Sequence, residues 1–301
     1  MRIFNSMRFR LFAAGLLSAS VMVGCGSDSK ASSNAPVASA FSVTSALGAL
    51  VGANCNVISA GGTILATAVT GANGTVPVDI EAANSDFPMT VECTDGSYFD
   101  EGSNTTQLNT GTIKSLIPTR AALAQAGNNL AVTTLTDLAV ELFKKAPASD
   151  RTSAAAVAAL DEIVRVLAPA LGANGGGLNI LSAPTPVTSA TTAIDETPAG
   201  RYAAYLAGLA LVAKDKNTNA AGLGALLASQ VSSGTPLDTT TVTQLVSKVQ
   251  TYAGTNGNTA LQSDVSGDSS GAGGTAQTPT ATGGTGGTGG TGATGAGSTG
   301  T

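Results

Sequence analysis

An apolar run near the N-terminus decides the compartment in which this chain folds. Leu11–Gly24 is rich in Ala, Leu and Val, and it follows Arg2, Arg8 and Arg10. The run is shorter than the roughly 20 residues that a membrane-spanning helix needs, and basic residues before it with small residues at its end are typical of an export signal. The sequence therefore predicts a signal peptide over residues 1–24 and a mature protein that folds outside the cytosol.

The end of the run resembles the signal of bacterial lipoproteins. A small residue, Gly24, stands directly before Cys25. In those proteins the cysteine receives the lipid and becomes the first residue of the mature chain, so the resemblance implies lipidation of Cys25 and attachment to a membrane. Gly26 follows in place of the Asp associated with retention at the inner membrane. In a cell with two membranes this favours the outer membrane.

Histidine is absent, which excludes several kinds of catalytic site. No Ser-His-Asp or Cys-His arrangement and no His-ligated zinc or haem site can form, and we predict no cofactor. The net charge of −5, without a cluster of Lys or Arg after the leader, argues against nucleic acid as a partner. Aromatic residues make up 4% of the chain and Trp is absent, so Ala, Val, Leu and Ile must build the core.

The remaining cysteines form a single candidate pair. Once Cys25 carries a lipid, Cys55 and Cys93 are left, and an exported compartment permits a disulfide between them. Two free thiols are the alternative, whereas a redox or metal site would need closer spacing or further ligands. We expect a bridge to run across the core of the domain that contains both residues.

We predict a Ser/Ala/Asn-rich flexible tether over residues 25–42. The sequence after it, 43–112, is typical of β-structure. Gly61-Gly62 separates two β-rich runs and indicates a hairpin. Val76, Val78 and Ile80 alternate with other residues, as in a half-buried strand. Another strand ends at Cys93.

Several segments of this stretch resemble the carboxypeptidase regulatory-like, transthyretin-like β-sandwich of bacterial exported proteins. They are Gly52-Ala53, the Gly71-Ala72-Asn73-Gly74 turn and Val91–Glu101, while Cys93 and Asp95 depart from the pattern. Asn129–Ala139 is similar to a segment that follows the sandwich in those proteins. The resemblance implies an α+β chain, with a small antiparallel, prealbumin-like β-sandwich before a helical domain, and it brings no agreed catalytic role.

Helical spacing dominates the region 113–253, where we expect an α-helical domain. Thr133 is placed to cap a helix that buries Leu135 and Leu138. Pro169 should kink or end the next helix, and Asp238 is expected to cap the last one. The Gly/Thr-rich tail, 254–301, holds too little apolar surface to offset the entropy of ordering and is predicted to be disordered.

The acidic residues Asp95, Asp100 and Glu101, with Tyr98 between them, are the weak candidate for a metal site. Calcium requires six or more oxygen ligands, and the spacing matches no compact calcium loop. A solvated turn is the simpler interpretation, and paired-carboxylate catalysis ranks below both. Tyr202 and Tyr205 are interpreted as the largest side chains of a thin core.

These observations predict a non-enzymatic, lipid-anchored envelope protein that binds a protein or glycan partner. The alternative is a carrier of a small apolar ligand among the helices, which a cavity of about 300 Å³ or more would support. A hydrolase ranks third and would have to work with carboxylates alone. Two carboxylates in one deep pocket, within about 10 Å of each other, would support it.

Overall fold

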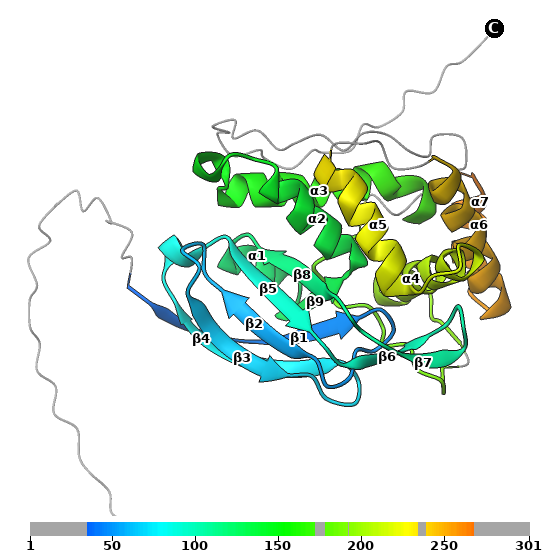
Figure 1. The fold of residues 1–301 in the computed structure, drawn as a ribbon, viewed down its shortest axis with the longest axis horizontal. Helices are drawn as coiled ribbons and strands as arrows, with labels where there is room; N and C mark the ends of the chain where they lie inside the picture. The colour runs from blue at the N-terminus through cyan, green and yellow to red at the C-terminus, as the bar shows by residue number, and fades with distance from the viewer. Residues whose placement is uncertain (1–34, 172–177, 192, 234–238, 268–301) are drawn as a thin grey trace, which may run out of the picture. The chain divides into compact units, whose positions relative to one another are not determined.

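The computed structural model describes residues 35–171, 178–191, 193–233 and 239–267. It has an α+β fold, with β-sheets over residues 37–133 followed by a helical region over 134–265 (Figure 1). The signal peptide, Cys25, most of the tether, Asp238 and the end of the tail lie outside the described residues.

The first strand begins inside the predicted tether and continues beyond its end at residue 42. β1 (Val37–Ala46) pairs antiparallel with β4 (Thr75–Ala82) and buries Phe41 and Val43. The prediction of a flexible tether up to residue 42 is therefore wrong from Val37 onward. The Ser/Ala-rich composition gave no sign of a strand here, because the partner of β1, the strand β4, lies far along the chain.

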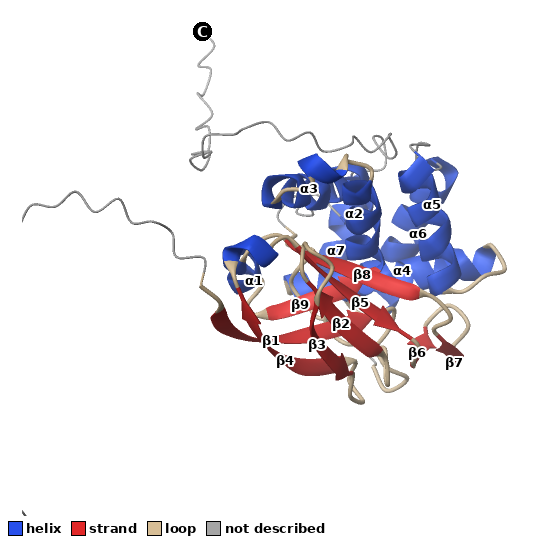
Figure 2. Cartoon of the chain, turned by 60° about the vertical axis from the view of Figure 1, so that its left-hand side comes forward, coloured by secondary structure: helices blue, strands red, loops and turns tan. Residues whose placement is uncertain are grey.

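Two sheets and a hairpin contain the strands among the described residues (Figure 2). One sheet has the order β4-β1-β9, in which β9 (Asn129–Thr133) runs parallel to β1. The other has the order β3-β2-β5-β8 and is antiparallel throughout. Its strands are β2 (Asn54–Ile58), β3 (Ile64–Val69), β5 (Met89–Thr94) and β8 (Thr112–Ile117). The hairpin joins β6 (Ser97–Asp100) to β7 (Thr105–Leu108).

The disulfide joins neighbouring strands of one sheet. Cys55 on β2 stands directly opposite Cys93 on β5, with an S–S distance of 2.02 Å and a Cα–Cα distance of 4.1 Å. Both cysteines are buried. The pairing is the one considered from the sequence, but the expectation that the bridge crosses the core is wrong, because β2 and β5 pair with each other.

The start of the predicted helical domain also differs. Strands β8 and β9 occupy part of it, and only the short helix α1 (Arg120–Gln125) lies between them. β8 completes the antiparallel sheet at β5, and β9 completes the other sheet at β1. Both strands are short and are stabilised by partners that are distant in the chain. The helical spacing of apolar residues after Thr133 therefore could not predict them.

Thr133 ends β9 and caps α2 as predicted, its side chain accepting a hydrogen bond from the amide of Thr136. The described helices after β9 are α2 (Thr134–Lys144), α3 (Ser153–Leu171), α4 (Pro198–Asp215), α5 (Ala220–Ser233), α6 (Thr239–Thr255) and α7 (Thr259–Gly267). α3 continues past Pro169 to Leu171, so Pro169 does not end the helix early, and the alternative of a kink at this residue stays a prediction. The prediction of a disordered tail from residue 254 is wrong as far as Gly267, because α6 continues to Thr255 and α7 buries Leu261 and Val265.

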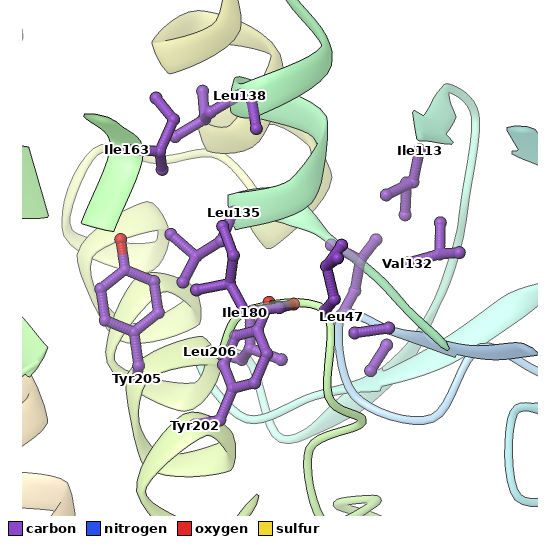
Figure 3. Close-up of a cluster of buried hydrophobic side chains, with 14 of the residues drawn as sticks. Leu47, Ile113, Val132, Leu135, Leu138, Ile163, Ile180, Tyr202, Tyr205 and Leu206 are labelled. Atoms are coloured by element: carbon purple, nitrogen blue, oxygen red, sulfur yellow. Dashed lines mark hydrogen bonds between the residues drawn. The ribbon is translucent and has the colours of Figure 1, made fainter. Parts of the chain in front are cut away.

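Sheets and helices share one hydrophobic cluster. Figure 3 shows part of this cluster, to which the β-region contributes Leu47, Ile113 and Val132, α2 contributes Leu135 and α4 contributes Leu206. Tyr202 and Tyr205 of α4 are fully buried in the same cluster, as predicted. The hydroxyl of Tyr202 forms a hydrogen bond with the side chain of Thr133, which ties α4 to the junction of β9 and α2.

Candidate functional site

The structure does not bring the three predicted acidic residues together. Asp95 is exposed in the turn after β5, at a φ of 62°, whereas Asp100 is buried at the end of β6. Within the described residues no group of three or more carboxylate or cysteine side chains is placed to hold a metal ion. The weak candidate site of Asp95, Asp100 and Glu101 is therefore not formed as a set.

A groove of about 500 Å³ between β8, α2 and α5 is the candidate functional site. β8 contributes Thr112 and Lys114, and α2 contributes Asp137 and Glu141, one helical turn apart on the same face. The wall on α5 consists of small residues, Ala225, Ala228, Ser229 and Ser233. The groove thus combines a charged floor with a wall that leaves room for another molecule.

Local hydrogen bonds hold the floor in place. The hydroxyl of Thr136 donates to the backbone carbonyl of Lys114 at 2.8 Å, which fixes the first turn of α2 against β8. The ammonium of Lys114 then lies 2.9 Å from Oε1 of Glu141 and 3.9 Å from Oδ1 of Asp137. Lys144 also reaches Glu141, at 3.6 Å. Two lysines therefore contact Glu141, while the Lys114 ammonium is farther from Asp137, on which the backbone of Lys114 also acts.

The two carboxyl groups differ in acidity because their surroundings differ. Burial raises the pKa of Asp137 to about 7, although the charge of Lys114 acts in the opposite direction. Burial also acts to raise the pKa of Glu141, but the hydrogen bond and charge of Lys114, with Lys144, outweigh it and lower the pKa. At neutral pH Asp137 is thus partly protonated and Glu141 is ionised.

Two carboxyl groups in one site whose pKa values are driven apart by their surroundings are typical of a general acid and a general base. Glu141, however, already has two ammonium groups at its Oε1, which balance its charge and make it a weaker base. None of the described residues that line the groove is aromatic, so none of them offers a ring on which a sugar could stack. The arrangement is better suited to holding a polar group of a partner than to attacking one.

Sequence reasoning missed this groove. Asp137 and Glu141 are four residues apart in a stretch predicted to be helical, which was the available signal for a shared face. Lys114 lies on a strand that the helical spacing did not reveal, and α5 arrives from far along the chain. The meeting of the three elements is a property of the tertiary structure.

A second cavity, of about 300 Å³, lies between α1, α3 and the segment 178–181. Its lining from α3 includes Val157, Leu160 and Val164, and Leu178 and Ile180 close the other side. Asp161 also lines it, and burial raises the pKa of this carboxyl. The cavity is apolar along most of α3, while Gln125, Asn179 and Asp161 add polar groups to its lining.

No family model, curated protein or solved structure matches this chain. Across the described residues, none of the helices combines the length and the apolar character needed to cross a bilayer.

Proposed function

We propose that this protein is exported, is anchored to the cell envelope through a lipid on Cys25, and acts by binding a protein or glycan partner without catalysis. The observation that carries the export step is the Cys55–Cys93 disulfide, because such bonds persist in oxidising compartments. The basic and apolar leader and the Gly24-Cys25 pair support the anchor. Gly26 supports the outer membrane as the destination.

The anchor is tested by replacing the lipidated residue. We expect Cys25→Ser to move the protein from the membrane fraction to the soluble fraction of an expressing bacterium, and to remove the acyl mass from the mature chain. A Cys55→Ser/Cys93→Ser variant is the matched control, which should stay with the membrane. Membrane attachment of Cys25→Ser would contradict the proposal.

The groove between β8, α2 and α5 is the proposed partner-binding surface. Two exposed residues of α5 allow a matched test, because Ser229 lines the groove and Leu226 does not. We expect Ser229→Arg to abolish recovery of the partner after cross-linking in the envelope, whereas Leu226→Arg should leave it unchanged. Recovery of the same partners with both variants would place the interaction elsewhere.

A carrier of a small apolar ligand is the second candidate, and the cavity along α3 favours it. Its volume of about 300 Å³ lies at the lower end of the range for small-molecule sites. We expect a fluorescent fatty acid to bind the wild-type protein and to bind Val157→Trp at least tenfold more weakly, since the larger ring fills the space. Equal binding by both proteins, or none, would remove this candidate.

A carboxylate-based hydrolase is the lowest-ranked candidate, and its supporting observation is the divergence of Asp137 and Glu141. Both lie within 4 Å of the Lys114 ammonium, so they are close enough to act together. The test is hydrolysis of an envelope glycan by the wild-type protein and by Asp137→Asn. Loss of hydrolysis in the variant without loss of glycan binding would favour a hydrolase over a non-catalytic binding protein.

We also propose that the two sheets form a sandwich of the transthyretin-like kind. The β2–β3 hairpin, the turn before β4 and the position of β5 support this proposal. The parallel pairing of β1 with β9 departs from an antiparallel sandwich. An experimental structure whose strand order differed from the regulatory-like family would overturn it.

A further inference from the structure

The β6–β7 hairpin rests directly on a helix. Its turn contains Gly102, and a Cβ added there would lie 2.2 Å from the backbone carbonyl oxygen of Ala210 on α4. Figure 1 shows β6 and β7 extending away from the sheets on the side where α4 lies. The backbone of the turn is therefore in close contact with the helix, and no side chain separates them.

Glu101 precedes Gly102 and is unusual among the described carboxyl groups. Both of its carboxyl oxygens are buried without a hydrogen-bond partner. The neighbouring Asp100 is only 2% exposed, and its Oδ2 accepts hydrogen bonds from the amide and hydroxyl of Ser103, at 3.2 and 2.7 Å. Asp100 thus has two donors for its charge, whereas neither carboxyl oxygen of Glu101 makes a hydrogen bond and the only donor acting on this carboxyl is the backbone amide of Glu101 itself.

The other groups around Glu101 do not supply a compensating charge. Tyr98 lies on β6 and Tyr252 on α6, and for both side chains burial, with a contribution from the charge of Glu101, raises the pKa to about 12. Lys214 of α4 contacts the turn near Gly102 but is exposed to solvent. β7 carries no ionisable side chain, and α5 approaches Tyr98 through the backbone of Ala221.

A buried carboxylate without donors or a counter-ion is costly, and such a group stays protonated instead. Burial, with a smaller contribution from the charge of Asp100, raises the pKa of Glu101 to about 8, although its own backbone amide acts in the opposite direction. Glu101 is therefore neutral while the hairpin is closed at neutral pH.

We propose that Glu101 is a pH-sensitive latch, which holds the β6–β7 hairpin against α4 and α6 when protonated and releases it when ionised. Release uncovers Tyr252 and the face of α4 around Ala210. Since an open hairpin returns Glu101 to water, opening should become about tenfold more favourable for each pH unit between about 4.5 and about 8. Above that range the dependence levels off, because the closed form is ionised as well.

Hydrogen exchange at the hairpin tests the latch. Exchange of the amides of Asn104 and Asn109, which donate to Asp100 and Gly96, is compared between wild type and Glu101→Gln at each pH, so that the intrinsic pH dependence of exchange cancels. We expect the ratio of wild-type to variant exchange to rise about tenfold per unit up to about pH 8, while amides of β2 and β5 show a constant ratio. Asp95→Asn neutralises an exposed carboxylate in the preceding turn and should behave as wild type.

A constant ratio across the pH range would overturn the proposal. So would protection of the hairpin that requires added Ca²⁺ and is lost in EDTA, because a bound cation would then satisfy the carboxylates. Should Glu101→Gln fail to fold, the ¹³C shift of the Glu101 carboxyl in the wild-type protein gives the answer directly. A midpoint near 4.5 would overturn the latch, and one near 8 would support it.

Discussion

Asp137 and Glu101 show how burial changes the role of a single residue. Asp137 lies on the floor of the groove, 3.9 Å from the Lys114 ammonium, and Glu101 lies in the hairpin turn, where neither of its carboxyl oxygens makes a hydrogen bond. Sequence reasoning singled out Glu101 as a weak cation ligand and gave Asp137 no role. Neither acidity could be predicted from the sequence, because the pKa of a carboxyl depends on what covers it.

Replacing Asp137 by Asn should change the pH dependence of stability. The folded pKa of about 7 lies above the ordinary value of 3.8, so the native state binds the proton more tightly than the unfolded chain. The resulting stabilisation is full below about pH 4 and is lost as the pH rises to about 7. We expect urea unfolding to show this decline for wild type and a smaller decline for Asp137→Asn, in which the raised pKa of Glu101 still contributes.

Asp79→Asn provides the control for that measurement, since Asp79 is an exposed aspartate of β4. It should retain the wild-type decline. A decline of the same size in Asp137→Asn would show that Asp137 does not carry the effect.

The elements predicted correctly are those with a local signal. Alternation revealed β4, two glycines marked the hairpin between β2 and β3, and Thr133 marked the start of α2. β1 and β9 lack such a signal, because β1 is stabilised by pairing with β4 and β9, and β9 by pairing with β1, all of them distant in the chain. The groove required α5 as well as β8 and α2, and nothing local in the sequence brings these three together.

Contact between α4 and α6 depends on a residue without a side chain. A Cβ added to Gly208 on α4 would lie 2.5 Å from Cγ2 of Val249 and 3.1 Å from its backbone nitrogen on α6. We expect Gly208→Ala to lower the free energy of unfolding by about 1–3 kcal/mol, because the helices must separate. Thermal or urea unfolding measures the loss.

A second substitution distinguishes a clash with Val249 from an effect of Gly208→Ala that does not involve this contact. Val249→Ala combined with Gly208→Ala should cost less than the sum of the two single changes, since the double variant removes the clashing methyl group. Strict additivity would mean that the contact between Gly208 and Val249 is not the cause.

At the scale of the whole molecule, one hydrophobic cluster links the sheets to the helices. Leu135 and Tyr202 lie fully buried where α2 and α4 meet the β-region (Figure 3). A cluster of this kind couples the unfolding of its parts. The sequence suggested separate sandwich and helical domains, and the shared core makes cooperative unfolding the expectation.

The disulfide provides the test of this coupling. It closes a loop with a sequence separation of 38 residues, for which chain entropy predicts a stabilisation of about 4 kcal/mol. Although the bridge lies in a sheet, we expect Cys55→Ala/Cys93→Ala to lower the unfolding midpoint of the helices as well. Far-UV circular dichroism measures the unfolding of the helices. Loss of the sheet signal before the helical signal would indicate two independent domains.

The sequence by itself determined the α+β order, the strands with clear alternation, the cap of α2 and the exclusion of histidine chemistry, because each depends on neighbouring residues or on composition. Only the tertiary structure decided that the disulfide lies within one sheet, that β1 and β9 pair in parallel and that Lys114 meets Asp137 and Glu141. These features join residues far apart in the chain. Their energies come from burial and from partners that no local pattern specifies.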